Sequence, residues 1–106
     1  MVKRGEIWLV EVAGTFAAQS PHLRMCVVLS PSELNLHLRT VLTAPMSSTC
    51  QVAPFRVPLT HAGKRGVILL DQIQSIERVH LKSRVGALSN TTQSKVLQVL
   101  QELFAE

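Results

Sequence analysis

One arginine in this sequence stands directly before a run of apolar residues, and its side chain has the clearest chemical use. Arg24 precedes Met25–Leu29, a run with β-branched valines at its centre. Such a run, ended by Ser30 and Pro31, predicts a buried strand with the arginine at its start. A guanidinium is charged at any physiological pH and offers a rigid fork of donors suited to phosphate. The alternative is an ordinary strand-end arginine that reaches water.

Two titratable side chains are candidates to work with Arg24. His22 lies two residues before it, so in an extended chain both side chains point to the same face. Histidine suits acid-base work near neutral pH, and the alternative for His22 is a solvated loop residue. Asp71 follows the apolar run Val67–Leu70, where a carboxylate must be paired or hydrated; it would orient Arg24 or only cap a turn. The remaining histidines fall in turns and are expected at the surface: His37, His61 and His80.

Short strands must position these residues. The first is predicted over Glu6–Val12, with Trp8 in the core or an interface, and a polar loop follows over 13–21. Pro31–Asn35 predicts a turn or a single helical turn that Asn35 ends. Pro45 and Pro58 belong at strand ends or edges. The other expected segments are strands at 38–46, 55–59, 67–70 and 84–86, a turn-rich basic connection at 61–66, an extended stretch at 73–76 and a helical turn within 77–82.

One longer helix is predicted at the end of the chain. Asn90 followed three residues later by Gln93 has the form of a capping box. Apolar residues then recur at helical spacing and form a stripe that should cover one side of the sheet: Val96, Leu100 and Leu103, widened by Leu97 and Phe104. Short strands followed by one terminal helix favour a mainly β protein built on a strongly bent antiparallel sheet or barrel.

Composition limits the classes of protein that fit. The 106 residues suit a single domain over 1–106, and a 46% apolar content implies a compact core or a surface that a partner covers. The net charge of +4 permits an anionic partner without requiring one. Neither a signal peptide nor a membrane-spanning run is expected. Cys26 and Cys50 match no disulfide framework or metal-ligand spacing, so free thiols in a reducing cytoplasm and no metal or cofactor are expected.

Several blocks of the sequence, taken in order, resemble the signature blocks of the MazF/PemK (Kid) toxin family. No single block is specific, but their ordered set, spread over nearly the whole chain and compatible in spacing, is similar to the family pattern. The blocks are Arg4–Trp8, Arg24 before its apolar strand, Asn35, Pro45–Ser48 and Gly66–Gln72.

The resemblance implies an SH3-like barrel of the CcdB/PemK type that works as a homodimer in the cytoplasm. Members are toxins of type II toxin-antitoxin systems: metal-independent, sequence-specific endoribonucleases that cleave single-stranded mRNA and are held inactive by a cognate antitoxin. The family's catalytic arginine and threonine fall on Arg24 and Ser47 by position. A serine in place of the threonine retains the hydroxyl and can still donate to a phosphate.

Further residues acquire expected roles from this resemblance. Ser48 and Gln72 are candidates to read RNA bases, and Asp71 to accept from a base edge. Phe55 falls where relatives place an aromatic residue near RNA and would stack on a base, or else belong to the core. Glu6 matches a family glutamate near RNA, although a strand-start carboxylate needs no such role. His22 becomes the candidate proton carrier, because a guanidinium stays protonated at any physiological pH and is a poor base.

Three departures separate this chain from Kid-like members. Met25 replaces a common proline, Leu69 stands at the place of a second arginine, and Ala18 at that of a first-loop histidine. A mechanism that uses that arginine and histidine therefore does not transfer unchanged. A CcdB-like DNA gyrase inhibitor and a catalytically lapsed SH3-like binding module are the alternatives. The chain lacks the tryptophan-containing tail of CcdB-like proteins, which favours the nuclease.

Overall fold

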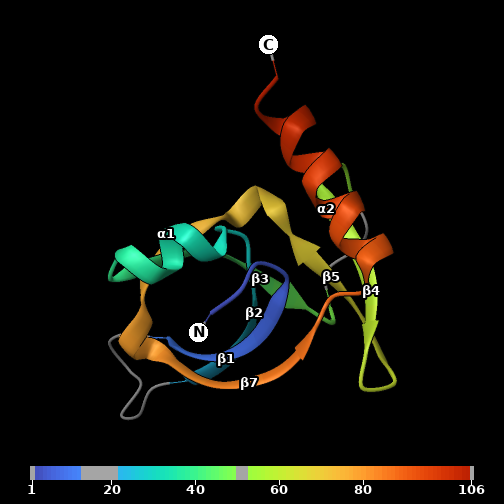
Figure 1. Cartoon of the computed structure of the whole chain (residues 1–106). Helices are drawn as coiled ribbons and strands as arrows, with labels where there is room; N and C mark the ends of the chain where they lie inside the picture. Colours follow the sequence, from blue (N-terminus) through green and yellow to red (C-terminus); the bar gives the residue numbers. More distant parts are fainter. Residues whose placement is uncertain (1, 13–21, 50–52, 106) are drawn as a thin grey trace.

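Antiparallel strands dominate the chain. The computed structural model describes residues 2–12, 22–49 and 53–105, and its elements are shown in Figure 1. In chain order they are β1 (Glu6–Val12), β2 (His22–Val28), α1 (Ser32–His37), β3 (Thr40–Ser47), β4 (Arg56–His61), β5 (Lys64–Leu69), the 3-10 turn η1 (Leu70–Gln72), β6 (Gln74–Glu77), the 3-10 turn η2 (Arg78–His80), β7 (Leu81–Ala87) and α2 (Asn90–Leu103).

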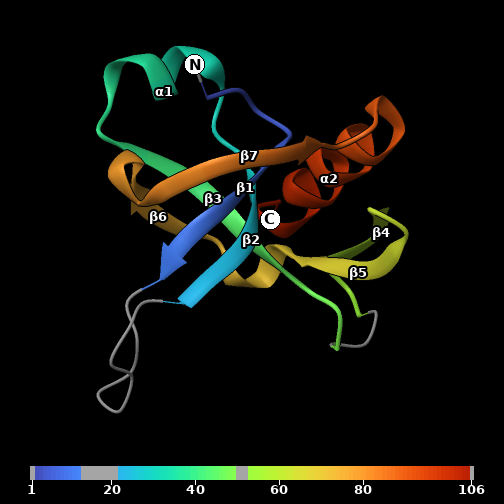
Figure 2. The ribbon, with the colours of Figure 1, turned by 90° about the horizontal axis from the view of Figure 1, so that it is seen from below.

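The strands form one curled sheet in the order β4-β5-β3-β2-β1-β7, with β6 also paired to β3. Figures 1 and 2 show β1, β2 and β7 arching together while the β4–β5 hairpin extends away from them. The curl follows from β3, which pairs with β6 through Thr43 and with β5 from Met46 onward. Pro45 lies between these two ladders. The missing N–H of this buried proline therefore interrupts neither of these two ladders, and Pro45 is paired only with Cys26 in the ladder to β2 among the described strands.

The β4–β5 hairpin is longer than the sequence predicted. We expected residues 61–66 to be a connection, but β4 extends through His61 and β5 starts at Lys64. Only Ala62 and Gly63 form the turn, and both have positive φ angles, 52° and 77°. A two-residue turn with both φ values positive matches the twist of a hairpin. The basic residues of this segment therefore lie on strands and project from defined faces.

The terminal helix closes the core. Val96 and Val99 of α2 are buried and belong to a cluster with Ile7, Val57 and Ile68. The predicted helix is confirmed, but its cap lies one residue earlier, because the Ser89 side chain accepts the hydrogen bond from the Thr92 N–H. The predicted stripe was wrong in two details: it omitted Val99, and it included Phe104, whose side chain is 75% exposed beyond the end of the helix.

Asn35 has a packing role inside α1 and does not end the helix as predicted. It is 1% exposed, and its amide donates to the carbonyl oxygens of Ser30 and Val2, 2.9 and 3.1 Å away. These bonds hold α1 against the segment before it and against the N-terminal segment. The Ser30 hydroxyl in turn accepts the Leu42 N–H of β3. A buried amide that is paired in this way ties three parts of the chain together.

Most other strand predictions are confirmed in type and differ in their bounds. The strands expected over Met25–Leu29 and over residues 84–86 are longer, and β2 includes Arg24 as its third residue. The strand expected over 38–46 is shifted to Thr40–Ser47, which brings Ser47 into the sheet. The loop predicted at 13–21 lies outside the described residues. The observed fold is the mainly β, curled antiparallel sheet with a C-terminal helix that the sequence predicted.

Candidate functional site

Arg24 and Ser47, the two predicted catalytic residues, are brought to one groove. The β2–β3 ladder pairs Val27 with Ala44 and Cys26 with Pro45. The last pair of that ladder lies two residues from Arg24 on β2 and two residues from Ser47 on β3. Both residues line a groove of about 490 Å³. Residues far apart in the sequence therefore meet because adjacent strands carry them.

The end of β3 fixes the position of Ser47. Ser47 pairs with Val67 of β5, and a Cβ on the neighbouring Gly66 would lie only 3.1 Å from the Ser47 carbonyl oxygen. Glycine therefore permits the close approach of β5. The Ser47 Oγ accepts a hydrogen bond from the Thr49 N–H at 3.2 Å, and Thr49 Oγ1 lies 3.3 Å away. This short turn sets the direction of the hydroxyl.

The groove is strongly cationic. Arg24, Lys64 and Arg65 line it, and all three are exposed. Among the described residues that line it there is no carboxylate. Three uncompensated positive charges at the edge of a low-dielectric core favour an anion there. The rest of the wall is largely apolar and comes from three strands: Leu9, Leu23, Met25 and Met46.

The histidines are placed differently from expectation. His61, expected at the surface, ends β4, is half-buried and lines the same groove. Its ring packs against Gly86 of β7, where a Cβ would lie 2.6 Å from Cε1. His80 lies 3.8 Å from a carboxylate oxygen of Glu11, and His37 is exposed. The backbone of His22 belongs to β2, but its side chain lies outside the described part of the structure.

Asp71 pairs with an arginine other than Arg24. Its two carboxylate oxygens accept hydrogen bonds from Nε and Nη2 of Arg56, each at 3.1 Å. These bonds hold the pKa of the Asp71 carboxyl below its usual value. Arg56 stands opposite Leu69 in the β4–β5 register, so an arginine on the neighbouring strand is paired with the leucine that stands at the place of the second arginine of Kid-like members. Sequence reasoning did not identify this pair.

Glu6 lies in a separate polar cluster. Its Oε1 accepts the Lys3 N–H at 2.8 Å and the Trp8 indole N–H at 3.1 Å, and its Oε2 accepts a 3.1 Å bond from Arg84. Glu6 is only 6% exposed. Burial raises the pKa of its carboxyl, but the hydrogen bonds from Lys3, Trp8 and Arg84 outweigh burial and leave the pKa below its usual value. We call Lys3, Glu6, Trp8 and Arg84 the Glu6 cluster.

The other predicted RNA contacts are accessible. Ser48 lines the groove beside Ser47 and is exposed. Phe55 is 36% exposed in the turn before β4, with a φ of 66°, and so lies outside the core. Gln72 is exposed at the end of η1. Their roles stay predictions. Sequence reasoning missed four residues near the groove. Three of them lie on the hairpin, where the alternation of residues over 56–69 contained the signal: His61, Lys64 and Arg65. The fourth is Thr49.

Among the described residues, the cysteine and the possible metal ligands provide no further site. Cys26 is a buried free thiol, and burial raises its pKa; Cys50 lies outside the described residues. Over 2–12, 22–49 and 53–105, no three histidine, cysteine or acidic side chains gather closely enough to hold a metal ion. No helix in those same ranges has the length and hydropathy needed to span a membrane.

Known proteins share this fold. The chain is similar in structure to a mycobacterial endoribonuclease solved in complex with its cognate antitoxin (TM-score 0.82, 16% identity, 96% of this chain and 93% of that one). It is also similar to MazE-MazF from Deinococcus radiodurans (0.82, 23%, 96% and 94%) and to the Mycobacterium tuberculosis toxin MazF-mt6 (0.78, 19%, 93% and 95%).

The sequence adds a relationship to the shared fold. A family model for the PemK-like, MazF-like toxins of type II toxin-antitoxin systems matches residues 3–104. The match covers β1 through α2, and it includes Arg24, Ser47 and the β4–β5 hairpin. The chain therefore belongs to the PemK-like, MazF-like family of type II toxins.

Proposed function

We propose that this toxin is a metal-independent endoribonuclease that cleaves single-stranded mRNA in the cytoplasm. The observation that carries the proposal is the groove in which Arg24 and Ser47 meet, lined by three cations and, among its described residues, by no carboxylate. Fold alone supports several activities. A groove of this charge suits a polyanion, and the 2′-hydroxyl of RNA supplies an internal nucleophile that needs no metal.

In the cleavage step, Arg24 stabilises the negative charge that develops on the phosphate. The 2′-oxygen forms a bond to phosphorus, the bond from phosphorus to the 5′-oxygen breaks, and the products are a 2′,3′-cyclic phosphate and a 5′-hydroxyl. The guanidinium donates two parallel hydrogen bonds to the phosphoryl oxygens, which gain negative charge in the transition state. In the described part of the chain no hydrogen bond from this guanidinium to another group is found, so its donors are accessible to substrate.

Ser47 and His22 complete the proposed reaction. The Ser47 hydroxyl, held by the turn to Thr49, donates to the same phosphate. His22, two residues from Arg24 in β2, takes the proton of the 2′-hydroxyl or returns one to the 5′-oxygen, since a guanidinium is too basic for either transfer at neutral pH. Ser48, Gln72 and Phe55 contact bases, with Phe55 stacking. Only the family resemblance suggests RNA contacts for Asp71 and Glu6, and hydrogen bonds within the protein already occupy both carboxylates.

Two protein partners belong to the proposal. A cognate antitoxin blocks the groove, and a second copy of the chain forms a homodimer. Several large apolar side chains are exposed, including Leu23 at 58%. Apolar side chains of this size in water favour surfaces that partners cover. The others of this kind among the described residues are Met25, Leu34, Leu36, Leu38, Leu42, Phe55, Val79 and Phe104.

The test is incubation of the purified protein with a long RNA, with and without EDTA, followed by primer extension. Discrete cuts that persist in EDTA and disappear in Arg24→Ala support the proposal. Intact RNA together with accumulating gyrase–DNA cleavage complexes would assign the protein to the gyrase inhibitors. Intact RNA without such complexes would indicate a lapsed binding module.

A further inference from the structure

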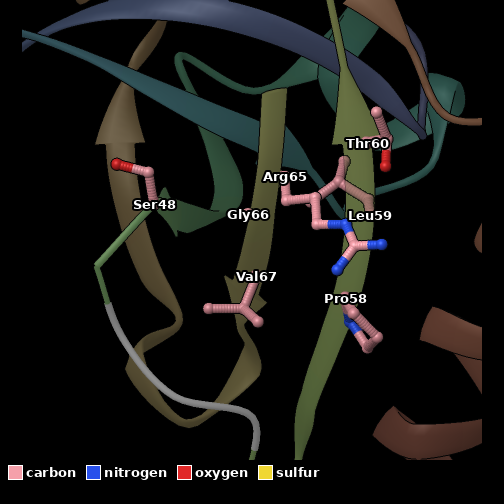
Figure 3. Close-up of a pocket in the computed structure, with 7 residues that line it drawn as sticks. All are labelled: Ser48, Pro58, Leu59, Thr60, Arg65, Gly66 and Val67. Carbon is pink, nitrogen blue, oxygen red and sulfur yellow. The ribbon is translucent and has the colours of Figure 1, made fainter. Parts of the chain in front are cut away.

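The outer face of the β4–β5 hairpin carries a second depression next to the groove. It has a volume of about 400 Å³ and is lined by Ser48, Pro58, Leu59, Thr60, Arg65, Gly66 and Val67. Ser48, Arg65 and Gly66 line both this depression and the groove that holds Arg24 and Ser47. Figure 3 shows the Arg65 side chain extending from β5 over β4. The two hollows are therefore parts of one surface, with Arg65 between them.

Sheet register places Arg65 on the face that carries Ser47. Ser47 pairs with Val67, and Val67 and Arg65, two residues apart on β5, point to the same face. Ser47 and Arg65 are thus diagonal neighbours across two strands, about 7–8 Å apart. Neighbouring phosphates of an extended RNA strand have a similar separation. Thr60, opposite Arg65 in the β4–β5 ladder, adds a hydroxyl on the same face.

Charge favours the same ligand. Arg65 is exposed, and the described residues show no hydrogen bond or ion pair from its guanidinium. The seven residues of the depression include two hydroxyls and one cation but no acid. The acid nearest in sequence to β5, Asp71, is paired with Arg56. A phosphate bound to Arg65 would therefore contact hydrogen-bond donors, and none of the seven residues that line the depression is a carboxylate that would repel it.

We propose that Arg65, with the hydroxyl of Thr60, binds the RNA phosphate next to the one that is cleaved. The strand then crosses from the groove of Arg24 and Ser47 over β5 onto the hairpin. This inference rests on the proposed ribonuclease activity and adds a subsite to it. Arg65 is a binding residue in this arrangement and takes no part in proton transfer or bond cleavage.

The test compares Arg65→Ala, Arg65→Lys and the control Arg39→Ala, which removes an exposed arginine just before the opposite end of β3. The substrate is a short labelled RNA that spans a cut mapped by primer extension. We expect Arg65→Ala to lower kcat/KM about tenfold, mostly by raising KM. The slope of log affinity against log salt should fall by about 0.7, the amount for one phosphate contact on a single strand. Arg65→Lys should retain that slope.

The outcomes separate this inference from the function beneath it. If the wild type cuts RNA and Arg65→Ala matches Arg39→Ala in KM and salt slope, the subsite is refuted while the ribonuclease stands. The same holds if Arg65→Ala cuts normally but loses inhibition by an acidic antitoxin segment, which would assign Arg65 to that partner. If the wild type neither binds nor cuts RNA, both proposals fail.

Discussion

The groove of Arg24 and Ser47 and the Glu6 cluster both contain an arginine and polar side chains, but they differ in what pairs with the charges. In the Glu6 cluster, one nearly buried carboxylate accepts three hydrogen bonds from its neighbours. In the groove, three exposed cations face no carboxylate among the described lining residues. Charges that are satisfied internally stabilise a fold, and charges left for a ligand serve binding. The comparison assigns structure to the first region and function to the second.

The largest expected effect is the loss of RNA cleavage caused by Arg24→Ala. Loss of a preorganised donor to the transition state should lower kcat by about 10²–10³-fold, and Arg24→Lys should restore little because an ammonium makes no bidentate contact. Initial rates on a labelled RNA measure this loss. Urea unfolding should show unchanged stability, since Arg24 is exposed. Full activity in Arg24→Ala would contradict the assignment of the groove to RNA cleavage.

The next effect is on stability, through Glu6→Ala. Removing the carboxylate takes away the acceptor of the Lys3 N–H and of the Trp8 indole N–H. We therefore expect a loss of about 1–3 kcal/mol in the free energy of unfolding. Urea unfolding measures it, with Glu102→Ala, an exposed glutamate of α2, as a control within about 0.5 kcal/mol of wild type. Unchanged stability with a raised KM for RNA would instead place Glu6 at the RNA interface.

Ser47→Ala should have a milder effect on cleavage than Arg24→Ala. The hydroxyl contributes one hydrogen bond to the phosphate, so a loss of about tenfold in kcat/KM is expected. Ser47→Thr restores the hydroxyl and should retain activity, which distinguishes the loss of the donor from a disturbance of β3. Activity equal to wild type in Ser47→Ala would remove this residue from the site.

The sequence predicted the sheet better than it predicted the site. Apolar runs identify β1, β2, β3 and α2, because burial of one face imposes a period on the chain. That signal does not predict how the strands are arranged, and their arrangement is what brings Arg24 and Ser47 to one groove. The family resemblance supplied those two residues. Without it, an ordinary strand-end arginine was the preferred interpretation of Arg24.

The basic hairpin shows why the rest was missed. Residues 61–66 contain turn formers and charges, so the sequence favoured a loop, yet only Ala62 and Gly63 make the turn. Once the strands continue to the turn, Lys64 and Arg65 alternate between faces, and Arg65, unlike Lys64, lines both hollows. Likewise, nothing local indicated that Asp71 would pair with Arg56, 15 residues away. Long-range partners follow from register, which short-range patterns do not encode.

The smallest effect, and the one specific to the Glu6 cluster, is on the pH dependence of stability. The pKa of the Glu6 carboxyl is lowered in the folded protein from its usual value of 4.5. Above that usual value the carboxyl is ionised in both states, and its contribution to stability is complete. As the pH falls below it, the unfolded chain binds the proton first, so the contribution shrinks and is lost once the pH passes the folded pKa.

Urea unfolding of wild type and Glu6→Gln between pH 7 and pH 3.5 measures this difference. Glutamine keeps the shape of the side chain but does not titrate in this range, while Asp71, whose pKa is also lowered, is the same in both proteins and cancels. The advantage of wild type over Glu6→Gln should be constant near neutral pH and decrease below about 4.5. An advantage that stays constant through that range would mean that the Glu6 carboxylate is no better stabilised in the folded protein than in water. The cluster would then be no more satisfied than the groove, and the contrast between the two regions would fail.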